Sequence, residues 1–171
     1  MARPDWTALA ADHAKSIRAF TAAAEAVPEV RWEQPLGEGQ WKPSQVAEHL
    51  RLAYEVVGRE LGGSLGLRVR TPWWVRVYVR LRYLPSILRS GRLPGKQRAP
   101  HEIKPGDGPF PRAATLASLA NLAATTEATL ATRRAERRPG LSHHIFGQLP
   151  PTESLRFLTV HNQHHTRQIG G

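Results

Sequence analysis

Four segments of this chain repeat apolar residues at steps of three and four, and proline or glycine separates them. That spacing places the apolar side chains on one face of an α-helix. The predicted helices cover residues 5–27, 43–61, 112–134 and 151–169. Residues 29–40 are expected to form a loop, and no convincing strand is present. The pattern therefore predicts an all-α, four-helix bundle, in which metal and cofactor sites lie between facing helices.

The length of 171 residues fits a single domain, residues 1–171, and the hydrophobic fraction of 40% is enough for a core. Cysteine is absent, which excludes disulfides, thiolate metal ligands and a cysteine nucleophile. The longest uncharged stretch tested, residues 113–126, is too short to span a membrane. The N-terminus lacks the apolar region of a signal peptide. We therefore expect a soluble, cytoplasmic protein without a transmembrane segment.

The positive charge is concentrated in one segment. The chain has 24 basic and 14 acidic residues, a net charge of +10. Residues 68–104 hold ten basic residues and one acid, so this stretch carries nearly all of the excess. It lies within residues 64–111, which we interpret as a basic, proline-rich insertion between the second and third helices of the bundle.

The insertion has an ambiguous pattern. The spacing of Trp73, Val77 and Leu81 fits a helix, although residues 75–82 also alternate like a strand. Proline before this region and Ser86 to Gly91 after it favour a short amphipathic helix. Residues 93–111 hold five prolines and are expected to form a long loop, which in a compact domain is usually functional or a lid.

The fourth predicted helix contains the most informative residues, His161 and His165. Residues four apart on a helix are neighbours, so their imidazoles could share one cation. Both lie on the same stripe as Leu158 and should face the bundle interior. Two core histidines satisfied by hydrogen bonds are the alternative.

His49 favours the metal interpretation. It lies in the middle of the second helix between Val46 and Ala53, so it should also point inward. Three inward histidines, with no cysteine and few inward carboxylates, have few partners other than a metal ion, and burying them unpaired would be costly. Three histidines also leave one coordination position open, as catalytic metal sites do.

Five further residues are weaker candidates for supporting the ligands or binding substrate: His13, Gln45, His164, Arg76 and Arg80. His13 lies on the buried stripe of the first helix, where a core histidine is the simpler interpretation. His164 lies about 60° around the helix from His161, at the rim of the site. Arg76 and Arg80 would attract an anionic substrate if the insertion is a lid. No catalytic residue is assigned.

Several motifs together resemble the DinB/YfiT-like superfamily: Trp41-Lys42-Pro43-Ser44, Glu48-His49-Leu50, the loop 143–149 and the helix residues 160–169. The similarity covers most of the chain except residues 64–111. It implies a four-helix bundle, often dimeric, in which His49, His161 and His165 bind a divalent metal. Lys42 departs from the Ser or Thr usual before the proline, so we expect the start of that helix to be less well fixed.

The resemblance leaves the activity open, because some members are similar to thiol S-transferases that use bacillithiol or mycothiol and others to metal-dependent hydrolases. A hydrolase needs a carboxylate base, but the residues between the paired histidines are Asn162, Gln163 and His164, and Glu48 projects about 100° from His49. A coordinated thiol is deprotonated by the metal itself. A thiol S-transferase or detoxification enzyme is therefore favoured, with a small-molecule thiol as substrate and Zn, Ni, Cu or Fe as the metal.

Two other classes of function compete with this enzyme. One is a non-catalytic protein that binds a metal or small molecule in the same fold. The other is a nucleic-acid or membrane-surface binder, because Trp73, Trp74, Tyr78 and Tyr83 alternate with arginines in the insertion. The simplest interpretation of these aromatic residues is that they pack the insertion onto the bundle while the arginines are solvated, which makes nucleic-acid binding the weaker hypothesis.

Overall fold

The computed structural model describes residues 5–64, 66, 71–94 and 99–170. Its elements are α1 (Trp6–Ala26), α2 (Glu29–Trp32), α3 (Pro43–Leu61), α4 (Trp73–Ser90), the 3₁₀ turn η1 (His101–Ile103), α5 (Arg112–Ala135), β1 (Ser142–His143), β2 (Gly147–Gln148) and α6 (Pro151–Ile169). The protein is mostly helical, as the sequence predicts. Arg68, Arg70, Lys96 and Arg98 of the basic segment lie outside the described residues.

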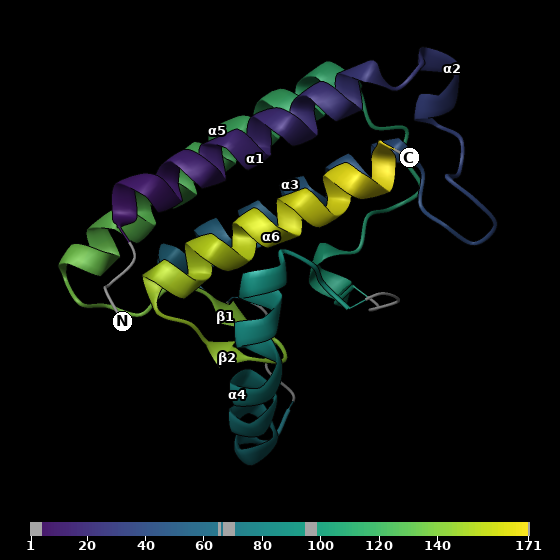
Figure 1. Ribbon diagram of the computed structural model, residues 1–171. Coiled ribbons are helices and arrows are strands. Elements are labelled where there is room, and N and C mark those ends of the chain that lie inside the picture. The colour runs from purple at the N-terminus through teal and green to yellow at the C-terminus, as the bar shows by residue number, and fades with distance from the viewer. Residues whose placement is uncertain (1–4, 65, 67–70, 95–98, 171) are drawn as a thin grey trace.

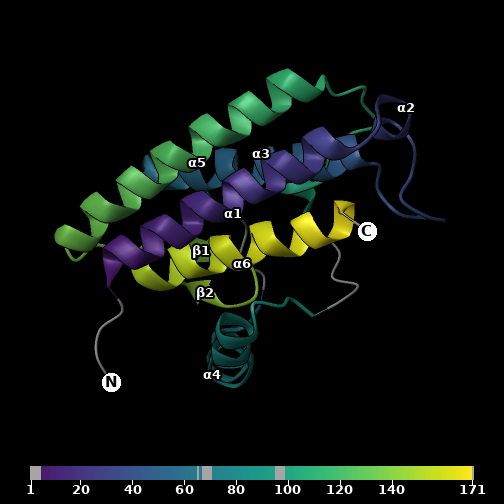
Figure 2. The same ribbon diagram turned by 45° about the horizontal axis from the view of Figure 1, so that its top comes forward.

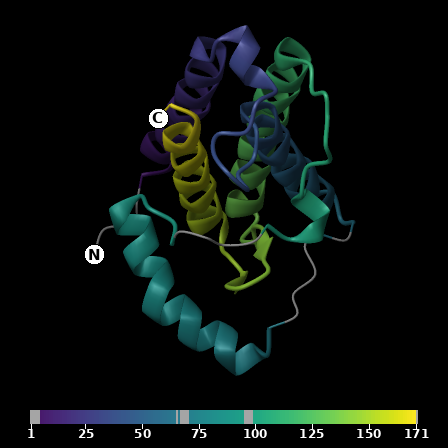
Figure 3. The same cartoon turned by 90° about the vertical axis from the view of Figure 1, so that its right-hand side faces the viewer.

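The long helices α1, α3, α5 and α6 pack around one apolar core (Figure 1, Figure 2). Viewed from the side, α1 lies against α6 and α3 lies against α5 (Figure 3). Each helix contributes a fully buried side chain, namely Phe20, Leu50, Leu119 and Leu155. The four helices match the four periodic segments to within one or two residues at each end, because their apolar stripes are the faces that meet.

A chain of buried hydrogen bonds joins these four helices. The Nδ1–H of His13 donates to Glu127, 2.9 Å away, so Nε2 of His13 accepts from the hydroxyl of Tyr54 at 2.8 Å. The Tyr54 oxygen in turn accepts from the amide of Asn162 at 2.8 Å, and that amide also donates to Ser16 at 2.9 Å. Burial lowers the pKa of His13 and raises that of Tyr54, which keeps the imidazole and the phenol neutral.

Lys42 makes no side-chain cap at the start of α3, as its sequence predicts, but other contacts hold this end of the helix. The side-chain oxygen of Gln45 accepts from the backbone N–H of Lys42 at 3.1 Å, which is one half of a capping box. The Lys42 ammonium donates to Glu33 at 3.3 Å and to the carbonyl of Asp107 at 3.2 Å. The lysine therefore ties the helix start to two loops instead of leaving it loose.

Four short elements were not predicted. Residues 29–32 form helix α2 at the start of the expected loop, and residues 101–103 form η1 within the second one. β1 and β2 pair as an antiparallel hairpin that leads into α6. Elements of two to four residues are too short to show a hydrophobic period, so the sequence pattern could not reveal them.

Helix α4 is longer than expected and continues through Ser86–Ser90 to Gly91. Gly91 has a φ of 63°, the left-handed conformation that commonly follows the last residue of a helix. Only Leu84 and Ile87 of this helix are buried, against α6. Figure 3 shows the remainder of α4 standing away from the other helices.

The aromatic side chains of α4 do not pack onto the bundle, which corrects the interpretation made from the sequence. Trp73, Trp74 and Tyr78 are 70%, 63% and 62% exposed. The amphipathic pattern was real, but most of the apolar face it defined is turned to solvent. In the described part of the chain, no helix is long and apolar enough to cross a membrane.

The first prediction concerns the buried hydrogen-bond chain. Replacing Tyr54 with Phe leaves Nε2 of His13 and one N–H of Asn162 without a partner inside the protein. We expect Tyr54→Phe to lower the free energy of unfolding by about 1–3 kcal/mol, measured by urea denaturation. Tyr83→Phe removes the same hydroxyl from an exposed position on α4 and should leave the midpoint unchanged. Equal stability of the two variants would contradict the role given to Tyr54.

Candidate metal centre

The three histidines singled out in the sequence meet between α3 and α6. Nε2 of His161 lies 3.2 Å from Nε2 of His49 and 3.1 Å from Nε2 of His165. One ligand atom of each residue lies within 4.8 Å of the others. The arrangement follows from local geometry, because His161 and His165 are one turn apart on α6 and His49 faces them from the middle of α3.

The outer nitrogens of two of these rings are held by hydrogen bonds. Nδ1–H of His49 donates to the backbone carbonyl of Ile103 at 2.7 Å, and Nδ1–H of His165 donates to the side-chain oxygen of Gln168 at 2.7 Å. Each bond places the proton on Nδ1, so both Nε2 atoms present lone pairs toward His161. Such second contacts are typical of metal-ligating histidines, because they fix the tautomer and the ring orientation.

The three nitrogens fit a tetrahedral metal ion better than they fit one another. If Nε2 of His161 carries a proton, it can donate that proton to only one of its two neighbours. Its contact with the Nε2 atom of the other neighbour then has no good hydrogen bond. A tetrahedral ion with Zn–N bonds of ~2.0–2.1 Å requires nitrogens about 3.3 Å apart. The observed separations of 3.1 and 3.2 Å are close to that value. The donor set and its spacing therefore suit a divalent cation of the zinc type.

The electrostatic surroundings keep the three imidazoles neutral. Burial lowers the pKa of His49 to about 4, against the opposing effect of its bond to Ile103. Burial also lowers the pKa of His161 and of His165 well below the usual value, and the facing imidazoles lower both further. Neutral imidazole is the form that binds metal, so the site is prepared for a cation at neutral pH.

Aromatic rings border the histidines on two sides. Trp41 lies against His49 with ring centroids 4.9 Å apart, and Phe157 stacks beside His161 at 6.3 Å. His143, on the hairpin before α6, packs against Phe157 at 4.7 Å. Burial lowers the pKa of His143 to about 3, so this ring is neutral as well. On these two sides, uncharged rings therefore border the site.

His143 and Phe157 are neighbours of the site that reasoning from residue spacing missed. His143 appeared only within the loop 143–149 that resembles the superfamily, and Phe157, four residues before His161, could have been found from the same helical stripe. The carbonyl of Ile103 could not have been found, because a backbone acceptor in a loop leaves no sequence signal.

The structure places the weaker candidates around the site to different degrees. The His164 ring lies 5.0 Å from that of His165, at a partly exposed position. His13 belongs to the buried hydrogen-bond chain with Glu127 and Tyr54, as a core histidine. The side-chain amide of Gln45 donates to the carbonyl of Gly106 at 2.8 Å, so Gln45 fixes the start of α3 and the loop beside it.

The arginines Arg76 and Arg80 contact the hairpin instead of the histidines. Arg80 donates to the carbonyl of Gln148 at 2.9 Å and to Glu153 at 2.8 Å. The side chain of Arg76 lies beside Gly147 on β2. These contacts attach α4 to the start of α6, so the arrangement gives no support to a lid whose arginines face the histidines.

The nearest acid in the sequence is already engaged. Both oxygens of Glu48 accept from Arg51 at 2.8 Å, which directs this carboxylate along the helix and away from a role as base. Among the described residues, no aspartate or glutamate joins the three histidines in a metal-binding group. The donors are therefore three neutral nitrogens.

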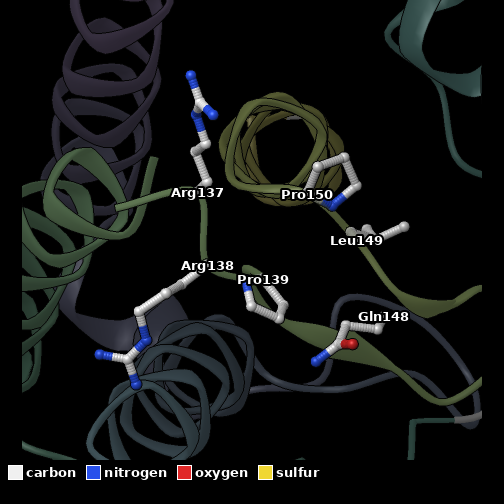
Figure 4. Close-up of a pocket in the computed structure, with 6 residues that line it drawn as sticks. All are labelled: Arg137, Arg138, Pro139, Gln148, Leu149 and Pro150. Atoms are coloured by element: carbon white, nitrogen blue, oxygen red, sulfur yellow. The ribbon is translucent and has the colours of Figure 1, made fainter. Parts of the chain in front are cut away.

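A surface cavity of about 310 Å³ lies elsewhere, at the turn that follows α5 (Figure 4). Its lining residues are Arg137, Arg138, Pro139, Gln148, Leu149 and Pro150. None of the three histidines lines it, and the two arginines extend in different directions in Figure 4. The convergence of the histidine nitrogens, and not this cavity, locates the candidate site.

Comparison with protein families gives one match. A sequence model described as the DinB superfamily matches residues 12–169, which includes most of α1, all three histidines and the segment 64–111. No curated protein and no solved structure gives a significant match.

The second prediction is that metal binding requires all three histidines. We expect His49→Ala, His161→Ala and His165→Ala each to lose stoichiometric metal, measured by elemental analysis of protein purified without an affinity tag. His101→Ala is the matched control, because His101 is exposed on η1 and should leave the metal content unchanged. Metal retained after His161→Ala would contradict the site.

The third prediction concerns acid stability of the metal-free protein. An unfolded histidine titrates near pH ~6.5, whereas folded His143 has a pKa of about 3. The stability from keeping it neutral is therefore complete above pH ~6.5 and is lost as the pH falls, because the unfolded state takes up the proton first. At pH ~5 this costs about 2 kcal/mol for His143.

Urea midpoints of the chelator-treated protein at neutral pH and at pH ~5 measure this loss. We expect His143→Gln to reduce the pH dependence by about that amount. His101→Gln, at an exposed position, should keep the full dependence. The same pH dependence in both variants would show that His143 is not held neutral by the fold.

Proposed function

The chain belongs to the DinB superfamily. From this membership and the three converging histidines, we propose that the protein binds a divalent metal ion through His49, His161 and His165. We propose further that it acts as a metal-dependent thiol S-transferase or detoxification enzyme. The observation that carries the proposal is the pair of Nε2–Nε2 separations, 3.1 and 3.2 Å, between rings whose outer nitrogens are already fixed. Zn, Ni and Fe all suit three imidazole ligands.

We place this site in a four-helix bundle formed by α1, α3, α5 and α6, with residues 64–111 as an insertion between α3 and α5. The contacts among these four helices support the bundle, and the match to residues 12–169 supports one domain. A homodimer and a cytoplasmic location stay predictions.

The lack of a free base near the site favours a thiol over hydrolysis. Three neutral imidazoles leave both positive charges of a divalent ion unbalanced, so an anionic fourth ligand, either a thiolate or a hydroxide, is favoured. A bound ion supplies Lewis acidity, which lowers the pKa of a coordinated thiol or water. Hydrolysis also needs a base for water, and the carboxylate closest in sequence, Glu48, is held by Arg51.

The residues of the chain then have distinct tasks. Ile103 and Gln168 orient the rings of His49 and His165 through hydrogen bonds. Phe157 and His143 form an uncharged border on the side of His161, which is the ligand residue that remains partly exposed. This border suits an apolar part of a substrate and lowers the local dielectric around the reacting group.

A non-catalytic protein that holds a metal or small molecule is the second candidate. It uses the same three histidines, and it is favoured by the engagement of Glu48 with Arg51, which leaves the site without the base closest in sequence. Turnover alone separates the two candidates.

The fourth prediction tests the thiol. Addition of mycothiol or bacillithiol to cobalt-substituted protein should produce the absorption of a cobalt–thiolate bond, and the zinc-loaded protein should transfer the same thiol to an electrophile. His161→Ala should abolish both signals, whereas His101→Ala should keep them. Cobalt binding without any thiol-induced absorption would contradict the transferase and leave the metal-binding protein.

A further inference from the structure

Helix α4 carries an apolar stripe that faces away from the rest of the protein. The outer stripe consists of Trp74, Val77, Tyr78, Leu81 and Pro85. With 100° between successive residues, these five side chains fall within a sector of about 100°. All five are exposed, and Leu81 reaches 72% exposure.

This exposure is concentrated on α4. In the described part of the chain, seven large hydrophobic side chains are exposed, and six of them lie on this helix: Trp73, Trp74, Val77, Tyr78, Leu81 and Tyr83. Single exposed hydrophobic residues are ordinary, but four of these six share the outer stripe, and a contiguous patch of this kind marks an interaction surface. The patch therefore needs a binding partner whose chemistry fits it.

We propose that the outer stripe of α4 binds the surface of a membrane that contains anionic lipids. Helices that lie in the interface combine tryptophan and aliphatic residues on one side with basic residues at the edge. Tryptophan and tyrosine also prefer the level of the lipid headgroups, because their rings are apolar and their N–H or O–H groups stay hydrated. Trp74 and Tyr78 have this character at the centre of the stripe.

The charge of the segment matches an anionic surface. Arg82 and Arg89 follow the stripe along one edge and are exposed. Residues 61–101 contain no aspartate or glutamate, so nothing in this stretch repels a negative surface. Each arginine near an anionic membrane strengthens binding by roughly fivefold.

The same charges disfavour a second copy of the chain as the occupant. A symmetric contact places the same patch of both copies face to face, which would bring the arginines of two α4 helices together without an acid from this segment. A nucleic acid is also a poorer match, because Val77, Leu81 and Pro85 offer no aromatic ring on which a base can stack.

The helix is held so that the stripe stays accessible. Leu84 and Ile87, which lie beyond the Val77 edge of the stripe, are buried where α4 contacts α6. Arg156 donates to the carbonyl of Leu88 at 3.2 Å and Arg167 donates to that of Gly91 at 2.7 Å, which fixes the end of α4. Figure 3 shows the first part of the helix projecting beyond the bundle.

Vesicle co-sedimentation of the full-length protein tests the proposal. We expect wild-type protein to bind vesicles of phosphatidylcholine with phosphatidylglycerol, to bind pure phosphatidylcholine more weakly, and to be released by salt. Trp74→Gln/Leu81→Gln should weaken binding to the anionic vesicles at least tenfold. Val30→Gln, which removes an apolar side chain that is 75% exposed on α2, is the matched control and should bind as wild type does.

The contribution of charge is tested with Arg82→Gln/Arg89→Gln, for which we expect binding to anionic vesicles to weaken roughly 20-fold. Arg18→Gln/Arg137→Gln removes two exposed arginines elsewhere and should change binding much less. Neither α4 variant touches the histidines, so metal content and circular dichroism should match wild type. Because Arg82 and Arg89 are exposed, this variant keeps the proposal testable even if the stripe variant fails to fold.

Three results would overturn the proposal. One is anionic-vesicle binding that the stripe variant leaves unchanged. Another is a wild-type dimer that this variant dissociates, with no vesicle binding, which would assign the stripe to a second copy. The last is single-stranded DNA retention that the variant abolishes, again without vesicle binding, which would assign it to nucleic acid.

Discussion

The structure depends on the way in which buried and half-buried polar side chains join α3 and α6 at two adjacent levels. At one level, Tyr54 accepts a hydrogen bond from Asn162. At the next, His49 faces His161 and His165. Because Asn162 directly follows His161, a shift of α6 along α3 would break both levels together. Buried polar groups of this kind set a unique register, since an unpaired donor or acceptor costs about 1–3 kcal/mol.

The two levels have opposite requirements. At the level of Tyr54, hydrogen bonds run without a break from Glu127 through His13, Tyr54 and Asn162 to Ser16. At the level of His49, three nitrogens converge and cannot all be satisfied by one another. The continuous chain supplies rigidity, and the converging nitrogens beside it are the place where a bound ligand would contribute free energy. A rigid frame around an unsatisfied donor set is what a metal site requires.

The sequence predicted the helices and site residues that depend on the period and spacing of side chains. It did not predict which helix faces are covered by a neighbour and which remain exposed. The helices α1, α3, α5 and α6 and the meeting of His49 with His161 and His165 follow from steps of three and four. The period of α4 was equally clear, yet it could not show that its apolar side would remain exposed. Contacts that use the backbone, such as Ile103 with His49, were also beyond reach, because a carbonyl is the same in every residue.

Helix α6 separates the two surfaces that this protein presents. His161 and His165 point toward α3. Arg156 and Arg167 hold the end of α4, and they lie about 120–140° around α6 from His161. The basic segment is therefore attached to the back of the helix that supplies two of the three candidate ligands. A change in the outer stripe of α4 has no contact through which to remove a histidine, and a loss of metal leaves the arginine bonds to α4 in place. The two surfaces therefore lie on different sides of α6 and use different side chains, so the proposed metal binding and the proposed membrane binding can be altered one at a time.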